Sequence, residues 1–163
     1  MKKPSFLTAM KDDMNKSLIS AAVMTLFFAL SSAAYAETFD FETYVTNFDY
    51  AARKEMKMSS AELIEAVKSG TAVLVDIRFK EEHQVWNFGF GMKIPLNELP
   101  ARLAEIPKDK IIVTACPHND RANIARLYLL SKGYKAKYLE DGLLSLAEAL
   151  RGDAAKKMAE SVK

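Results

Sequence analysis

The chain has 163 residues, half of them apolar, which is typical of one globular domain with a hydrophobic core. Of its 23 basic and 21 acidic side chains, four lysines and two aspartates lie in residues 1–36, which leaves 19 of each sign in the remainder. A domain without net charge lacks the basic patch by which proteins bind nucleic acid or anionic membranes, so we expect neither as a partner beyond the leader.

The first 36 residues have the organisation of a secretory signal peptide. Lysines precede an apolar run over residues 18–30, and the triplet Ala-Tyr-Ala at 34–36 has the small-x-small pattern of a cleavage site. Met14 is an alternative start that would give a more ordinary leader. The alternative to cleavage is an anchor helix, although the strictly apolar run is short for a membrane span. Either reading predicts an exported domain, periplasmic if the source is a Gram-negative bacterium.

Residues 37–57 are rich in aromatic and charged side chains and contain neither Gly nor Pro. We expect a short helix or an extended arm that packs on the domain. A role in covering the core is favoured, and an interaction surface is the alternative.

The first half of the domain alternates helix and strand signals. Ser59-Ser60-Ala61-Glu62 has the spacing of a capping box and predicts a helix that stops at Gly70. The continuous apolar run over residues 72–77 predicts a strand buried on both faces, as in a parallel sheet. We expect a short polar helix over residues 79–85 and a loop rich in Gly and aromatic residues over 86–91.

A brief extended stretch is expected over residues 92–96, where Pro95 restricts strand pairing. Asn97 is a candidate cap for a helix that ends before Pro107.

The second half repeats the alternation. Residues 110–115 predict another buried strand, 122–132 a helix, 135–139 a third clear strand and 143–150 a last helix. Alternating strands and helices with short connections predict an α/β fold with a mainly parallel sheet. The tail over residues 152–163 is expected to be a frayed, solvated helix.

Cys116 is the one cysteine of the chain, so it is either a buried apolar residue or a reactive thiol. It follows the strand over residues 110–115, and its loop enters a helix whose first N–H groups and dipole favour an anion. This position predicts a thiol pKa below the ordinary value, and therefore a nucleophilic thiolate. Asn119 tolerates left-handed backbone geometry, and Arg121 provides a cation for an anionic substrate. We therefore favour the reactive thiol.

Other candidate residues have plainer alternatives. His118 either tunes the thiolate, contacts substrate or is simply exposed, and His83 is expected at the surface. Asp76 and Arg78 are catalytic in type, but a structural ion pair near the site is favoured. Two histidines and one cysteine without close spacing predict no metal site, and no glycine-rich phosphate loop is present, so no cofactor is expected. Three aromatic residues either line the mouth of a pocket or pack in the core: Trp86, Phe88 and Phe90.

Several segments, in their order and spacing, resemble the rhodanese-like family. The similar segments are Val75-Asp76-Ile77-Arg78 with Glu81 and Glu82, Lys93 to Asn97, Cys116 to Arg121, Gly133-Tyr134, and Leu139 to Leu143. The resemblance extends from about Met58 to Leu150. It divides the chain into a signal peptide (1–36), an N-terminal arm (37–57), a rhodanese-like domain (58–151) and a C-terminal tail (152–163).

The resemblance implies a central, mainly parallel five-stranded sheet flanked by helices on both faces, and a single-domain sulfurtransferase of the exported type. Cys116 would take the outer sulfur of a small anion such as thiosulfate and pass it, as a persulfide, to a thiol acceptor or a protein sulfur acceptor. Arg121 would steady the charge. The loop residues that would hold the sulfur are Pro117, His118, Asn119, Asp120 and Ala122, although Pro117 has no N–H to donate.

The sequence departs from the family pattern at three places. Pro117 and Asn119 stand where many relatives have an arginine and a glycine, and Trp86-Asn87 replaces the usual Gly-His pair. The six-residue loop from Cys116 to Arg121 nevertheless has the length found in sulfur-transferring members, whereas the related phosphatases have a longer loop. Two alternatives stay open: a non-catalytic binding or persulfide-carrier module, and an anion reductase or phosphatase that uses the same loop.

Overall fold

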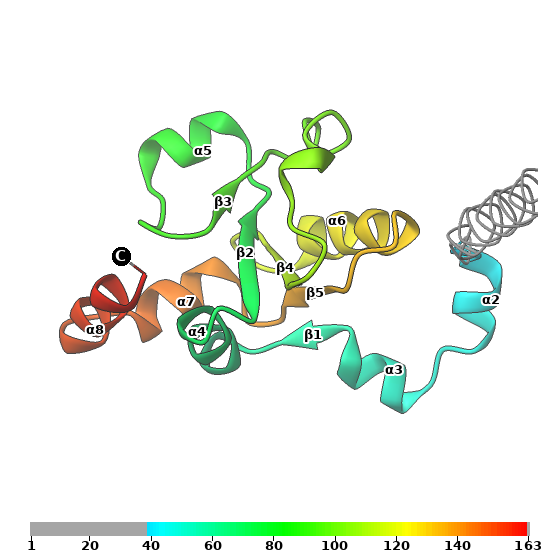
Figure 1. The fold of residues 1–163 in the computed structure, drawn as a ribbon, viewed down its shortest axis with the longest axis horizontal. Coiled ribbons are helices and arrows are strands. Elements are labelled where there is room, and N and C mark those ends of the chain that lie inside the picture. The colour runs from blue at the N-terminus through cyan, green and yellow to red at the C-terminus, as the bar shows by residue number, and fades with distance from the viewer. Residues whose placement is uncertain (1–38, 163) are drawn as a thin grey trace, which may run out of the picture. The chain divides into compact units, whose positions relative to one another are not determined.

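The computed structural model describes residues 39–162, whose ribbon is shown in Figure 1. The signal peptide expected over residues 1–36 lies outside the described residues. Within the described part, strands and helices alternate along the chain, as the sequence predicts.

The sheet has five strands in the order β1-β5-β4-β2-β3, and all four pairings are parallel. The strands are β1 (Lys57–Met58), β2 (Ala72–Asp76), β3 (Met92–Lys93), β4 (Ile111–Ala115) and β5 (Ala136–Leu139). The two central strands β2 and β4 pair along their whole length and end level with each other, Asp76 opposite Ala115. The expected mainly parallel five-stranded sheet is therefore confirmed, and the carboxyl ends of its central strands meet at one edge.

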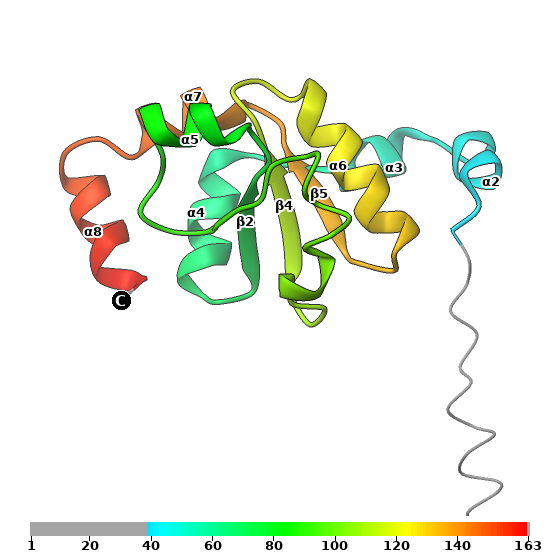
Figure 2. The same ribbon diagram turned by 90° about the horizontal axis from the view of Figure 1, so that it is seen from above.

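Helices cover both faces of the sheet (Figures 1 and 2). The helices of the described residues are α2 (Phe41–Thr46), α3 (Tyr50–Glu55), α4 (Ser60–Lys68), α5 (Lys80–Val85), α6 (Asp120–Ser131), α7 (Gly142–Ala149) and α8 (Asp153–Ser161), with a 3₁₀ turn η1 (Leu103–Glu105). The predicted capping box is present at α4, where Ser59 N donates to Glu62 Oε2 at 2.8 Å.

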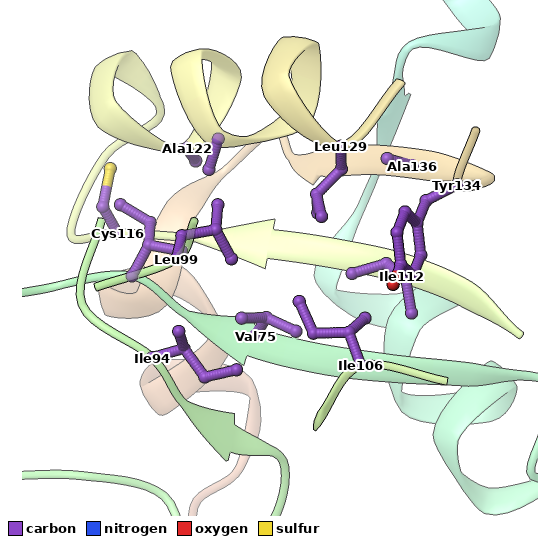
Figure 3. Close-up of a cluster of buried hydrophobic side chains, with 12 residues drawn as sticks. Val75, Ile94, Leu99, Ile106, Ile112, Cys116, Ala122, Leu129, Tyr134 and Ala136 are labelled. Carbon is purple, nitrogen blue, oxygen red and sulfur yellow. The ribbon is translucent and has the colours of Figure 1, made fainter. Parts of the chain in front are cut away.

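Two buried clusters fill the space between the sheet and the helices. Successive side chains of a strand point to opposite faces, so Leu74 packs in the cluster beneath α4 and α7, whereas Val75 packs in the cluster beneath α6. Figure 3 shows the α6 cluster, in which Ile112 of β4 meets Leu129 of α6. Cys116 belongs to this same cluster, at the end of β4.

The helix expected from Asn97 to Ile106 is not present. The chain makes turns there and forms only η1. Tertiary contacts organise this segment, since the Arg102 guanidinium donates to the Lys93 carbonyl at 3.1 Å, and Leu99 and Ile106 are both buried in the α6 cluster. Local helix propensity is a weak preference that such contacts override.

The two ends of the described chain also differ from simple expectation. The arm forms two short helices, α2 and α3, rather than one element, and neither contains a buried residue. The tail was expected to be frayed and solvated, but α8 is a regular helix in which Met158 is buried, with 2% of its surface exposed. The buried Met158 shows that this amphipathic helix packs its apolar face on the domain.

Candidate active site

Cys116 is the first residue beyond β4 and lies between the sheet and the start of α6 (Figure 3). Hydrogen bonds hold this loop from both sides. Thr114 Oγ1 donates to the Ala122 carbonyl at 2.8 Å, which ties the strand to the first turn of α6, and Leu143 N donates to the Cys116 carbonyl at 2.9 Å. The cysteine is therefore fixed at the edge where the central parallel strands end, the usual place for a ligand site in such a sheet.

Gly142 determines which way the loop's peptide groups face. Its φ of +73° favours glycine, and a Cβ there would overlap the Pro117 carbonyl oxygen and lie 2.5 Å from that of His118. Because these two carbonyls face Gly142, the N–H groups of the same trans peptides face the opposite way. The Asp141 carboxylate holds this turn by accepting bonds from Ser60 N at 3.1 Å and Ser60 Oγ at 3.0 Å.

The backbone N–H groups of Ala122 and His118 lower the pKa of the Cys116 thiol, because a nearby N–H favours the thiolate. Burial has the larger, opposite effect, because the Cys116 side chain has no exposed surface. Asp120 adds to it: its Oδ1 accepts a hydrogen bond from Sγ at 3.4 Å, and its charge disfavours a thiolate. Together these effects raise the pKa of Cys116 above the ordinary value of a thiol, so the expectation of a lowered pKa was wrong. The thiol is the favoured form at rest.

Arg121 is paired with a carboxylate from α5 rather than with the sulfur. Its Nη1 and Nη2 donate to the two carboxylate oxygens of Glu82 at 2.7 and 3.0 Å, and its guanidinium lies 5.6 Å from the Phe79 ring centre. This pair lowers the pKa of Glu82 to about 2. A Cys116 thiolate would still be close enough to raise the pKa of Arg121 by Coulomb attraction. Arg121 is thus present as the cation predicted for an anionic substrate, and Glu82 is already paired with it.

Asp76 and Arg78 form the buried ion pair that we expected near the site. Arg78 Nε donates to Asp76 Oδ1 at 2.9 Å and Nη2 donates to Oδ2 at 2.6 Å. Nη2 also donates to the Trp86 carbonyl at 3.0 Å, and the guanidinium lies 3.8 Å from the Trp86 ring centre. The pair therefore braces the end of β2 against the loop that follows α5.

His83 was expected at the surface, and this was wrong. Its side chain is 10% exposed, and its Nε2 lies 3.3 Å from Asp76 Oδ1. Its polar neighbours do not indicate this contact, because only the packing of α5 turns one side of that helix toward the buried ion pair.

The remaining predicted residues take separate places. Asn119 has a φ of −151°, so the left-handed geometry expected of it is absent, and its Nδ2 donates to the Glu140 carbonyl at 3.1 Å. His118 is exposed, and its side chain makes no hydrogen bond within residues 39–162. The aromatic segment Trp86, Phe88 and Phe90 packs against the α4 and α7 cluster and borders a hollow of about 510 Å³ beside α8.

Glu82 and Gly142 both belong to segments that resemble the family. Nothing in the sequence, however, places either residue against the loop of Cys116. Within residues 39–162, no helix has the length and apolar character needed to cross a bilayer, and no cluster of His, Cys, Asp or Glu is arranged to hold a metal ion.

The family described as "Rhodanese-like domain" matches residues 59–149, more than half of the chain. The chain therefore belongs to the rhodanese-like domain family. A crystal structure of a rhodanese-related protein from Thermoplasma volcanium superposes with a TM-score of 0.51 at 25% identity, covering 56% of this chain and 90% of that one.

Curated relatives with similar sequences include two sulfurtransferases and a transcriptional regulator. A sulfurtransferase of Allochromatium vinosum is 33% identical over 76 residues, 46% of this chain and 71% of the relative. The thiosulfate sulfurtransferase GlpE of Pseudomonas savastanoi pv. phaseolicola is 27% identical over 99 residues, 61% of this chain and 93% of the relative. An HTH-type transcriptional regulator of Mycobacterium tuberculosis is 34% identical over 102 residues, 59% of this chain, but the match spans only 43% of the regulator.

Proposed function

We propose that this protein is an extracytoplasmic sulfurtransferase that moves a sulfane sulfur from a donor such as thiosulfate to a thiophilic acceptor through a persulfide on Cys116. One observation carries the proposal: Cys116 lies at the carboxyl end of β4, in a loop of six residues that leads into α6, where the N–H groups of His118 and Ala122 favour its thiolate. Relatives named as sulfurtransferases support the reaction class.

The first half-reaction starts with loss of the Cys116 thiol proton to solvent. The thiolate attacks the outer sulfur of thiosulfate, a sulfur–sulfur bond forms at Cys116, and the bond to the sulfonate group breaks with its electron pair leaving on sulfite. In the second half-reaction an acceptor thiolate attacks the outer sulfur of the persulfide, and Cys116 leaves as a thiolate. The backbone N–H groups of the loop stabilise the negative charge that appears on the outer sulfur in both steps.

The residues around the loop have separate tasks in this proposal. The exposed side chains of His118 and Asp120 follow Cys116 in the loop, and the Asp120 carboxylate accepts a hydrogen bond from the thiol before the proton is lost to solvent. Arg121 contributes to binding an anionic donor once it shares its charge between Glu82 and the donor. The buried Asp76–Arg78 pair supports the edge of the sheet without touching the reacting atoms.

The test is intact mass spectrometry of the full chain after incubation with thiosulfate. We expect a gain of one sulfur atom, equal release of sulfite, and loss of the added sulfur on treatment with a thiol. Cys116→Ser is the matched control, because it keeps a small polar side chain and removes the nucleophile. Folded wild-type protein that takes up no sulfur, or that hydrolyses an aryl phosphate at a comparable rate, would contradict the proposal.

Two further measurements separate its parts. Repeated turnover with excess donor and acceptor distinguishes a sulfurtransferase from a persulfide carrier, which would take up one sulfur and release it only to a specific partner. Export is tested by N-terminal sequencing of the protein recovered from the periplasm of a Gram-negative host. Cleavage after Ala36 is expected, and retention of the whole chain in the cytoplasm would refute this part alone.

A further inference from the structure

The guanidinium of Arg126, near the middle of α6, is buried without a carboxylate at ion-pair distance among residues 39–162. Only 4% of the residue is exposed. Nη1 and Nη2 both donate to the Tyr44 hydroxyl, at 3.0 Å each, and Nε has no hydrogen-bond partner. A full positive charge is therefore buried against one uncharged oxygen.

This arrangement is unusual because proteins normally pair a buried charge or surround it with hydrogen bonds. The Tyr44 ring, 5.7 Å from the guanidinium, adds only a weak cation–π attraction. A second polar atom nearby, Asn123 Oδ1, is also buried without a partner. The site thus has unused hydrogen-bonding capacity and an excess of positive charge.

Two hollows meet at Arg126 and Tyr44, and both are lined by these residues. One hollow, of about 580 Å³, lies between the arm and β5 and includes Leu130 and Ala136. The other, of about 350 Å³, lies beside α2 and includes Phe48. Both volumes fall in the range of small-molecule sites, and the walls are mainly apolar.

Charge and apolar surface around the hollows favour the same kind of ligand. Lys135 and Lys137 border the larger hollow, where the one carboxylate, Glu55, is already paired with Lys137 at 3.1 Å. On the arm, Phe41 and Val45 border the smaller hollow and are more than half exposed, at 56% and 54%. An apolar chain with an anionic head would cover these side chains and neutralise the guanidinium.

We propose that Arg126 anchors a second ligand site, separate from Cys116, that binds a medium-chain fatty acid. The carboxylate displaces the Tyr44 hydroxyl and accepts the Nη1 and Nη2 hydrogen bonds with its two oxygens, and the alkyl chain occupies the adjoining hollows. One buried cation matches one negative charge. An acidic peptide fits less well, because its backbone N–H and C=O groups would be placed against apolar walls that offer few partners.

The test is isothermal titration calorimetry of the full chain with decanoate below its micelle concentration. Decanol, which lacks the charge, and acetate, which lacks the chain, are the matched probes. We expect decanoate to bind at least about tenfold more tightly than decanol, since charge-assisted hydrogen bonds are the stronger kind, and acetate to bind too weakly to measure.

Two variants assign the binding to this site. Arg126→Met keeps an unbranched apolar side chain without the charge, and should reduce decanoate affinity to the level of decanol while decanol binding is unchanged. Tyr44→Phe removes only the hydroxyl that competes for the guanidinium, and should make decanoate bind several-fold more tightly. A purely structural contact between these two residues would not produce that increase.

The result is separable from the proposed function, because Cys116→Ser should bind decanoate as the wild type does. Equal affinities of decanoate and decanol would overturn the proposal, as would unchanged decanoate binding in Arg126→Met or weaker binding in Tyr44→Phe. Binding of an acidic peptide in the absence of decanoate binding would equally overturn it, in favour of a protein partner.

Discussion

The two buried arginines of this domain, Arg78 and Arg126, differ in what surrounds their charge. Arg78 is fully buried and has a carboxylate, a carbonyl and the Trp86 ring around it, with only Nη1 lacking a hydrogen bond. Arg126 is almost as deeply buried and has one tyrosine hydroxyl. Because an unpaired buried charge is costly, the first arginine is explained by the fold alone, whereas the second calls for a partner that the fold does not supply.

The same contrast holds between the region around Cys116 and the region around Arg126. At the start of α6 the loop of Cys116 is held in place by the Gly142 turn, the Thr114 hydroxyl and the Glu82–Arg121 pair. Around Arg126, under the arm, buried polar atoms lack hydrogen-bond partners and hollows remain. Contacts that are all satisfied hold reacting groups in fixed positions, whereas polar groups without partners next to a hollow favour the binding of a further ligand.

The largest effect on stability is expected from breaking the buried ion pair of Asp76 and Arg78. Asp76→Ala leaves the Arg78 charge buried without a counter-ion and should lower the free energy of unfolding by about 3–5 kcal/mol, measured by urea denaturation. Asp76→Asn, which keeps the shape and one acceptor oxygen, is the control and should cost less. If Asp76→Ala were no more damaging than an average surface substitution, the contrast between the two arginines would disappear.

The next effect concerns the Gly142 turn. Gly142→Ala adds a methyl group against the Pro117 and His118 carbonyls at a φ of +73°, and should cost about 2 kcal/mol or more and abolish persulfide formation. Gly70→Ala is a matched control, since its φ is +71° but nothing lies within 4 Å of the added methyl. It should cost about 1 kcal/mol and form persulfide normally. Equal loss of sulfur uptake in both variants would refute a specific role for Gly142.

A smaller effect, of opposite sign to that of Asp76→Ala, is expected at the other arginine. Arg126→Met removes an unpaired buried charge and retains apolar volume, so the free energy of unfolding should be unchanged or higher by about 1 kcal/mol in the same urea titration. A loss as large as that of Asp76→Ala would mean that Arg126 is a structural residue after all.

The smallest effect is a shift in pH dependence. Burial and Asp120 raise the pKa of Cys116, and only the thiolate attacks, so sulfur uptake should rise with pH through the alkaline range, to above the pKa of an ordinary thiol. Asp120→Asn removes the negative charge beside the sulfur and should move the profile to lower pH, with several-fold faster uptake at neutral pH. Stopped-flow measurement of sulfite release across pH checks both statements, and an unshifted profile would contradict them.

Much of this architecture could be predicted from local patterns. The apolar runs over residues 72–77 and 110–115 predicted buried parallel strands, and the Ser59–Glu62 spacing predicted a capped helix, because each depends on neighbours in sequence. Strand β1 escaped prediction because it has only two residues. The segment after Asn97 was misread as a helix because its packing against the sheet, and not its own periodicity, decides its conformation.

The sequence by itself determined where the cysteine lies: at the end of a buried strand and before a helix. Only the tertiary structure decided the state of that sulfur, since burial and Asp120 outweigh the N–H groups and raise its pKa. Tertiary structure likewise decided that Arg121 meets Glu82 and that Arg126 meets no carboxylate among the described residues. Electrostatic energies depend on the distance and burial of groups far apart in the chain, and a sequence pattern records neither.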